Sequence, residues 1–180
     1  MENNRKLSVD EMGRISVSQF KEAPKTPIVV VLDNIRSLNN VGSIFRTCDA
    51  MLISQLVLCG ITACPPSQEI HKTALGAEDS VDWIHFDSTA DAVRHLRSQG
   101  YTICSVEQAV GSIALQDFRT DSSKKYAIIM GNEVKGVDQD VVNMSDCCIE
   151  IPQFGTKHSF NVSVTTGIVL WEMFRQIKLS

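Results

Sequence analysis

Short runs of apolar residues alternate along this chain with segments in which apolar residues recur at helical spacing. The clearest run covers residues 28–32, which are all isoleucine, valine or leucine. A continuous β-branched run of this length is typical of a strand that is buried on both faces. Further strands are predicted at residues 55–59, 81–86, 101–106, 126–130 and 147–151.

Helices are predicted between most of these strands. Residues 40–52 bring together on one face Val41, Ile44, Phe45, Cys48, Met51 and Leu52. Further helices are predicted at residues 67–75, 89–98 and 162–177, with a short helical turn at residues 138–143. Strands that alternate with helices indicate an α/β domain, built as a mostly parallel sheet with helices on both faces.

The length of 180 residues fits one domain with a substantial core. Residues 1–26 carry helix-start signals, with a capping box at Ser8 and Glu11 and a second short helix at residues 16–22. They are predicted to form a short helical extension to a domain of residues 27–180. No apolar run is long enough for a membrane helix or resembles the core of a signal peptide. We therefore expect a cytoplasmic protein without membrane contact.

Six cysteines raise the question of disulfides or a zinc site, but their spacing argues against both. There is no Cys-x-x-Cys pair, and Cys48, Cys59, Cys104 and Cys147 lie inside apolar runs. Cys147 and Cys148 are adjacent, so they point to opposite faces of any strand. We expect structural thiols in a reducing compartment, and no metal.

The formal net charge of −4 bears on any nucleic-acid partner. Nucleic-acid-binding proteins are usually basic, because the release of counterions from phosphates dominates their affinity. Any positive surface here must therefore be local. Candidates lie in or beside the polar segments described next: Arg36, Arg46, Lys72, Lys135, Lys157 and His158. The alternative is that these are ordinary solvated surface charges.

Three polar segments follow predicted strands, at residues 39–46, 131–136 and 151–164. In parallel α/β sheets, ligands bind beyond the carboxyl ends of the strands, which is where these segments begin. Each also has a purely structural interpretation. Asn39 and Asn40 suit a helix N-cap, Glu133 suits a surface loop, and Ser159 with Asn161 suits a capping pair. Arg46 is less easily explained, because its helix is apolar on the other face and a guanidinium offers a fork of donors to a phosphate or an oxyanion.

Taken together, the three segments resemble the three signature motifs of the SpoU (TrmH) family of RNA 2′-O-ribose methyltransferases, within the SPOUT superfamily. The first matches as Asn40 with Arg46 six residues later. The second matches as Gly131, Asn132 and Glu133 with Gly136, and the third as Ile151 and Pro152 followed by Ser159, Phe160, Asn161 and Ser163. The similarity covers roughly residues 27–171, with the order and spacing of the motifs intact.

The resemblance implies a SPOUT-type α/β knot, in which the C-terminal segment is threaded through a preceding loop as a trefoil knot. It implies S-adenosylmethionine as the cofactor and a homodimer with the active site near the subunit interface. It assigns cofactor binding to Val106, Glu107, Gly131, Asn132, Gly136, Ile151, Pro152 and Phe160. The catalytic set that it assigns is Asn40, Arg46, Glu133, Ser159 and Asn161.

Two features depart from the family pattern. Position 160 is commonly leucine, and Phe160 keeps an apolar wall while changing its shape. Many relatives carry an additional N-terminal RNA-binding domain, and 26 leading residues are too few for one. We therefore expect the core domain or the dimer to recognise RNA.

The reaction that the resemblance implies is methylation of a ribose 2′-hydroxyl in structured RNA by S-adenosylmethionine, with tRNA preferred to rRNA. A non-catalytic nucleotide-binding or RNA-binding α/β protein is the alternative. Because arginine stays protonated in proteins, we expect Arg46 to stabilise the nascent alkoxide and pin a phosphate rather than act as the base.

Overall fold

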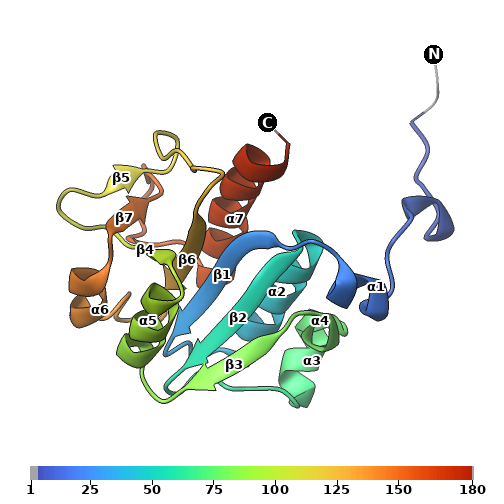
Figure 1. The fold of residues 1–180 in the computed structure, drawn as a ribbon, viewed down its shortest axis with the longest axis horizontal. Coiled ribbons are helices and arrows are strands. Elements are labelled where there is room, and N and C mark those ends of the chain that lie inside the picture. Colours follow the sequence, from blue (N-terminus) through green and yellow to red (C-terminus); the bar gives the residue numbers. More distant parts are fainter. Residues whose placement is uncertain (1–3, 180) are drawn as a thin grey trace.

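Seven parallel strands form the centre of the computed structural model, which describes residues 4–179 (Figure 1). Their spatial order is β3-β2-β1-β6-β4-β7-β5, and every pairing between them is parallel. The strands are β1 (Thr26–Asp33), β2 (Ile53–Cys59), β3 (Trp83–Phe86), β4 (Tyr101–Val106), β5 (Ile113–Ala114), β6 (Lys125–Met130) and β7 (Cys147–Glu150). The prediction of a mostly parallel α/β sheet is confirmed.

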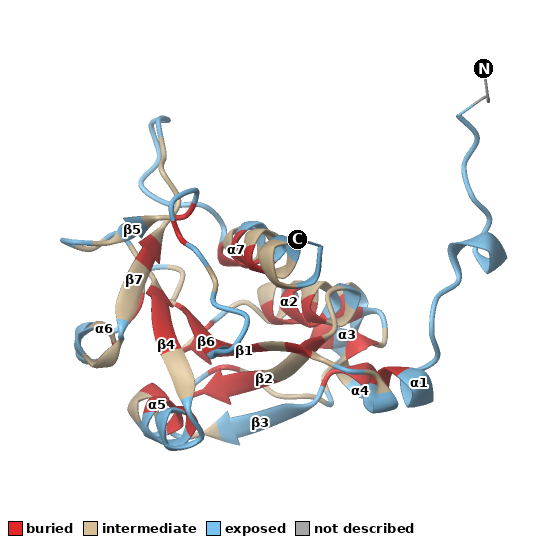
Figure 2. Cartoon of the chain, turned by 45° about the horizontal axis from the view of Figure 1, so that its top comes forward, coloured by how far each residue is buried: buried red, intermediate tan, exposed pale blue. Residues whose placement is uncertain are grey.

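Helices cover both faces of this sheet (Figures 1 and 2). One face packs against α2 (Leu38–Ala50), α3 (Gln68–Ala74), α4 (Ala77–Ser80) and α7 (Val162–Lys178). The other packs against α5 (Thr89–Ser98) and α6 (Gln139–Met144). The helix α1 (Val17–Glu22) and a 3₁₀ turn (Asp10–Met12) precede the sheet.

Strand β1 shows why its sequence lacks polar alternation. Ile28, Val30 and Leu32 point into the core beneath α2 and α7, whereas Val29 and Val31 point into the core beneath α5. Successive side chains of a strand alternate between faces, so a strand with helices above and below it needs apolar residues at every position. All five are essentially inaccessible to solvent.

The edges of the sheet are where the sequence was least informative. The edge strand β3 is short and mostly exposed, as Figure 2 shows, and it begins at Trp83, later than predicted. The strand β5 has only two residues and was not predicted, and neither was α4. Short elements bury little surface, so they leave little periodicity in the sequence.

Two N-terminal predictions are confirmed, the capping box of Ser8 with Glu11 and the short helix near residues 16–22. Residues 1–3 of the predicted extension lie outside the described part of the chain. Glu11 accepts a hydrogen bond from the Ser8 amide at 2.8 Å, and the Ser8 hydroxyl accepts one from the Glu11 amide at 3.4 Å. A second capping box, formed by Ser16 and Gln19, begins α1. Figure 1 shows the segment before α1 running away from the sheet. Within residues 4–179, no helix has the length and apolar character needed to cross a membrane.

The strand order places the three polar segments side by side. Strands β1, β6, β4 and β7 are consecutive neighbours, and all run in the same direction. The loops that leave their carboxyl ends therefore meet at one edge of the sheet, where ligands bind in open α/β folds. The loop after β1 leads into α2, whose first turn carries Asn39 and Asn40, and the loops after β6 and β7 contain the Gly131 segment and the segment that leads into α7.

Candidate active site

A cavity of about 1010 Å³ lies beyond the carboxyl ends of β4, β6 and β7. Its apolar lining includes Met130, Ile149 and Val162, and its polar lining includes Gln108 and Lys135. Ten residues predicted for cofactor binding or catalysis line it: Val106, Glu107, Gly131, Asn132, Glu133, Gly136, Ile151, Ser159, Phe160 and Asn161. The second and third sequence segments thus line one cavity, and the first segment is joined to its wall through hydrogen bonds of Asn40 with Glu133 and Asn161.

A chain of hydrogen bonds joins all three segments. The Asn40 side-chain nitrogen donates to Glu133 Oε1 at 3.0 Å, and Asn161 Nδ2 donates to Asn40 Oδ1 at 3.1 Å. Asn161 Oδ1 in turn accepts from the amides of Ser163 and Val164, which begins α7. The capping interpretation of Asn161 is therefore correct, and the same side chain also contacts the first segment.

Glu133 is a fully engaged acceptor. Its carboxylate accepts from the backbone amides of Arg36 at 2.9 Å and Ser37 at 3.0 Å, in addition to Asn40. Partial burial opposes ionisation of this carboxyl, but these donors outweigh it and lower the pKa of Glu133. A carboxylate with a lowered pKa and three donors is suited to fixing the loop before α2, and is a poor proton acceptor.

Asn132 shapes the loop in which it lies. Its backbone pairs with that of Gly136 in both directions, at 3.0 and 2.9 Å. Its side-chain oxygen accepts from the amides of Val134 and Lys135, and its side-chain nitrogen donates to the Asn34 carbonyl at 2.6 Å. Both polar atoms of the Asn132 side chain thus bond to backbone groups of the chain, and its backbone contributes to the cavity wall.

Gly136 is a position that only glycine suits. Its φ of +71° lies in the left-handed region, and a Cβ atom there would stand 2.2 Å from Glu107 Oε2. That oxygen accepts a hydrogen bond from the Val137 amide at 2.9 Å. The Glu107 carboxylate therefore fastens the loop after β4 to the loop after β6.

Gln108 was missed in the sequence, although it follows Glu107 directly at the end of a predicted strand. Its side-chain nitrogen donates to the His158 carbonyl at 2.7 Å, and both residues line the cavity. This bond connects the loop after β4 to the exposed segment just before Ser159. The position of Gln108 just after a predicted strand was the one sequence feature that could have indicated a place in the site.

Ser159 and Phe160 are accessible for contact with a ligand. Phe160 is 43% exposed and forms part of the apolar lining. Within residues 4–179, the Ser159 hydroxyl makes no hydrogen bond to another part of the chain, whereas Ser163 is bonded to Asn161. The alternative interpretation, in which Ser159 and Asn161 together cap a helix, therefore holds for Asn161 and not for Ser159.

Asn40, Arg46 and Pro152 do not line this cavity, although Asn40 is hydrogen-bonded to two residues that do. Arg46 lines a second hollow of about 590 Å³, together with Ser43, Lys72 and Gly167 of α7. Six residues along a helix place Arg46 about 9 Å from Asn40 in the axial direction and about 120° around it. The spacing that matches the first motif thus turns Asn40 toward Glu133 and Asn161 at the first cavity, and Arg46 toward the second hollow.

Four of the six candidate basic residues line one of the two hollows, and Arg36 and Lys157 line neither. Lys135 and His158 line the first, and Arg46 and Lys72 line the second. In the described part of the chain, no group of three or more His, Cys, Asp or Glu side chains is arranged to hold a metal ion.

An all-parallel sheet whose loops surround a cavity at the carboxyl ends of three adjacent strands defines an α/β ligand-binding domain. The sequence specifies the family within that class. The model of the SpoU rRNA Methylase family matches residues 27–171, and the chain belongs to this family.

Relatives and solved structures agree with this assignment. The chain is 30% identical to the tRNA (guanosine(18)-2′-O)-methyltransferase of Aquifex aeolicus, over 86% of this chain and 72% of the relative. It is 28% identical to the mouse tRNA (guanosine(18)-2′-O)-methyltransferase TARBP1, over 83% of this chain and 9% of the relative. The AdoMet-bound rRNA methyltransferase from Sinorhizobium meliloti superposes with a TM-score of 0.79 and 30% identity, over 89% of this chain and 61% of that one. The chain thus spans less than two thirds of the length of the mouse and Sinorhizobium proteins.

Proposed function

We propose that this protein transfers a methyl group from S-adenosylmethionine to a ribose 2′-hydroxyl of structured RNA. One observation carries the proposal: Glu133, Asn40 and Asn161, one from each family motif, form a continuous hydrogen-bonded chain at the cavity. Helix capping alone would explain Asn161, but it would not explain the hydrogen bonds that connect Asn161 to Asn40 and Asn40 to Glu133. The names of the relatives, which include tRNA and rRNA methyltransferases, support the same reaction.

The cavity is suited to the cofactor in size and chemistry. Its volume of about 1010 Å³ is at the upper end for a small-molecule site. Apolar side chains of Val106, Ile151 and Phe160 provide walls for an adenine ring. The carboxylates of Glu107 and Glu150 favour a sulfonium cation and offer acceptors to hydroxyl groups. The bound cofactor would supply an electrophilic methyl group.

The chain's own residues would orient the ribose and stabilise its oxygen. Ser159 has a free hydroxyl at the cavity, and Asn161 is held in place from both ends, by Asn40 and by α7. A ribose 2′-hydroxyl is a weak acid, so its oxygen needs a donor as negative charge develops. We assign that role to the Arg46 guanidinium, with the proton leaving to a phosphate or a water molecule.

Arg46 would reach the cavity of a second subunit. The exposed face of α7 beside the Arg46 hollow carries Val164, Ile168 and Trp171, which are 50%, 37% and 51% exposed. Their i, i+4, i+7 spacing makes one apolar stripe, which is typical of a helix that packs against a partner. A homodimer through this stripe would bury it and let the partner subunit's Arg46 complete the site. The remaining family features, the trefoil knot, the cytoplasmic location and the preference for tRNA over rRNA, belong to the same proposal.

The reaction is tested with two assays on the purified protein. Calorimetry measures binding of S-adenosylmethionine. The second assay measures transfer of labelled methyl groups to total tRNA and rRNA, and the methylated riboses are then mapped. Asn40→Ala should lose transfer, and Asn39→Ala, at the exposed neighbouring position, should retain it. Absence of cofactor binding at millimolar concentration would refute the proposal. Binding without transfer to either RNA would favour a non-catalytic RNA-binding protein.

A further inference from the structure

Two thiols lie against each other on β4 and β7, two strands whose ends line the cavity. Neither thiol belongs to the residues proposed for methyl transfer. The Sγ atoms of Cys104 on β4 and Cys147 on β7 are 3.4 Å apart. The two residues are direct partners in the register of these parallel strands. They lie 43 positions apart in the sequence, so the sheet alone brings them together.

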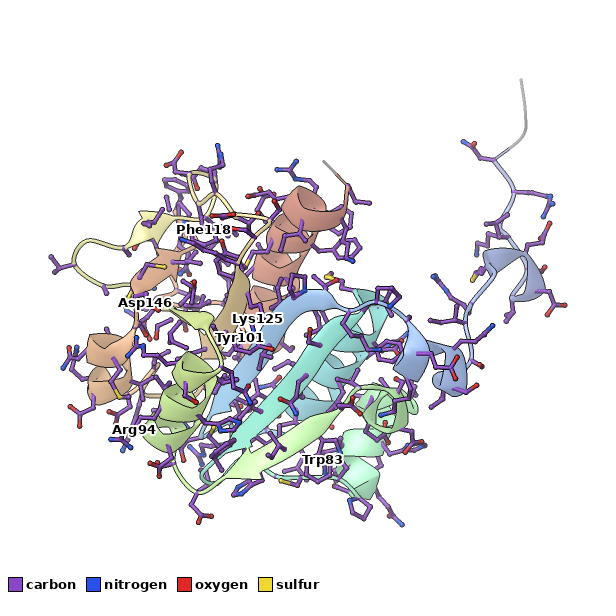
Figure 3. All side chains as sticks on the ribbon, in the orientation of Figure 1. Trp83, Arg94, Tyr101, Phe118, Lys125 and Asp146 are labelled. Atoms are coloured by element: carbon purple, nitrogen blue, oxygen red, sulfur yellow. The ribbon has the colours of Figure 1, made fainter. Side chains whose placement is uncertain are left out.

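The backbone geometry permits a covalent bond between them. Neighbouring strands lie about 4.8 Å apart, which falls within the Cα separation of about 4.4–6.8 Å found for disulfides. Asp146 holds the start of β7 against β4, because its amide donates to the Ile103 carbonyl and its carboxylate accepts from the Ile103 amide. Figure 3 labels Asp146 at this junction. On its other side β7 pairs with β5 only from Ile149 onward, so Cys147 has no strand beyond it that would oppose a small shift.

The two thiols are chemically unequal. Cys104 is fully buried, and Cys147 is half-buried. The hydrogen bond between them lowers the pKa of Cys147 and, together with burial, raises the pKa of Cys104. Reactivity follows thiolate character and access, so Cys147 is the thiol that an oxidant in solution meets first.

We propose that Cys104 and Cys147 form a reversible disulfide that links β4 to β7 when the protein meets hydrogen peroxide. The Cys147 thiolate attacks one peroxide oxygen and becomes a sulfenic acid, with release of hydroxide. Cys104 then attacks that sulfur, the new S–S bond forms, and water leaves. Two thiols lose two electrons in all, and one peroxide is reduced to two water molecules.

The other cysteines lack this arrangement. Cys148 is also half-buried, but its register partner on β4 is Ser105, and it lies on the opposite face from Cys147. Cys48 and Cys59 are fully buried, and burial raises the pKa of Cys59 to about 12. Cys148 is therefore a matched control, adjacent in sequence and similar in exposure but without a thiol neighbour across the strands.

The link would connect two walls of the cavity. Val106 at the end of β4 and Glu107 just beyond it follow Cys104, and Ile149 on β7 and Ile151 just beyond it follow Cys147. All four line the cavity. The oxidation state of the pair therefore sets how firmly these walls are held together. The proposal does not depend on methyl transfer, and it stands or falls independently of that function.

Peptide mass spectrometry tests the link. The full-length protein is treated with hydrogen peroxide, its free thiols are alkylated, and it is digested with trypsin without reduction. Trypsin releases Cys104 within residues 98–119 and Cys147 with Cys148 within residues 136–157. In wild type and in Cys148→Ser we expect these two peptides to be joined, and dithiothreitol to separate them. Cys147→Ser and Cys147→Ala should lose the joined species.

Several results would overturn the proposal. One is recovery of Cys147 as a sulfinic or sulfonic acid with no joined peptide. Another is a joined peptide that persists in Cys147→Ser and disappears in Cys148→Ser. A joined peptide that forms only after the protein has been unfolded would also exclude a link made in the native sheet.

Discussion

Asn161 at the start of α7 donates a hydrogen bond to the side chain of Asn40 in α2, although 121 positions separate them in the sequence. Asn161 Oδ1 simultaneously accepts the amides of its own helix. One side chain therefore begins a helix and fixes the orientation of a second amide, which is itself held by Glu133. The two functions of Asn161 can be separated by substitution.

Asn161→Asp keeps the acceptor that caps α7 but loses the donor to Asn40. We expect its unfolding free energy to stay within about 0.5 kcal/mol of wild type, since aspartate caps helices as well as asparagine does. Methyl transfer should fall about tenfold or more, because a directed hydrogen bond is lost. Asn161→Ala should lose transfer and also about 1–2 kcal/mol of stability. Denaturant unfolding and the labelled-methyl assay measure the two effects, and equal transfer by Asn161→Asp and wild type would contradict the assignment.

Glu133→Gln should destabilise the protein by about 1–2 kcal/mol, because an amide cannot accept all three donors that face the carboxylate. The effect depends on pH. The folded-state pKa of Glu133 is lowered, so its contribution is present above the ordinary glutamate pKa and is lost as the pH falls through the lowered value.

The difference in unfolding free energy between wild type and Glu133→Gln should therefore shrink on acidification from neutral pH. Denaturant titrations at a series of pH values measure it. A difference that stays constant below the glutamate range would mean that the carboxylate charge does not hold the loop.

Gly136→Ala should cost about 2 kcal/mol of stability and weaken cofactor binding. The new Cβ combines left-handed strain with a contact at 2.2 Å to the Glu107 carboxylate. Two controls separate these causes. Gly111→Ala has a φ of +80° but open space around the Cβ, and Gly155→Ala has neither strain nor contact. Thermal unfolding should rank Gly136→Ala lowest, then Gly111→Ala, with Gly155→Ala near wild type.

Mixed dimers test whether Arg46 acts on the partner's cavity. Arg46→Ala and Asn161→Ala should each be nearly inactive alone. If Arg46 acts across the interface, random mixing of the two leaves about a quarter of the sites complete, and transfer returns to that level. If Arg46 acts within its own subunit, mixing restores nothing. Arg46→Lys, which keeps the charge and loses the fork of donors, should remain impaired if the planar geometry is needed.

Trp171→Glu should convert the proposed dimer to a monomer, because a charge in the middle of an apolar interface would be buried without a partner. Sedimentation velocity measures the association state. Trp83→Glu is the control. Trp83 is 36% exposed and lies on β3, the strand at one edge of the sheet, outside the apolar stripe of α7. A dimer that survives Trp171→Glu would place the interface elsewhere.

Local sequence patterns were enough to predict the class of fold and most of the site residues. The run at residues 28–32 predicted a central strand because every position contacts a core, and helical spacing predicted α2 and α7 from their apolar faces. Asn40, Glu133 and Asn161 stood out because polar residues at strand ends and helix starts are few and chemically distinctive. For Gln108 the only local signal was its position at a strand end, and its bond to His158 depends on a contact across 50 residues.

Which residues share a hollow depends on how distant elements pack together. The strand order put the loops of β4, β6 and β7 around one cavity, and no local pattern contains that order. Helix geometry then separated Arg46 from Asn40, although the motif that contains both is intact. It was likewise the register of β4 with β7 that brought Cys104 to Cys147. Periodicity reports which face of an element is buried, and contacts between distant elements depend on how those faces pack.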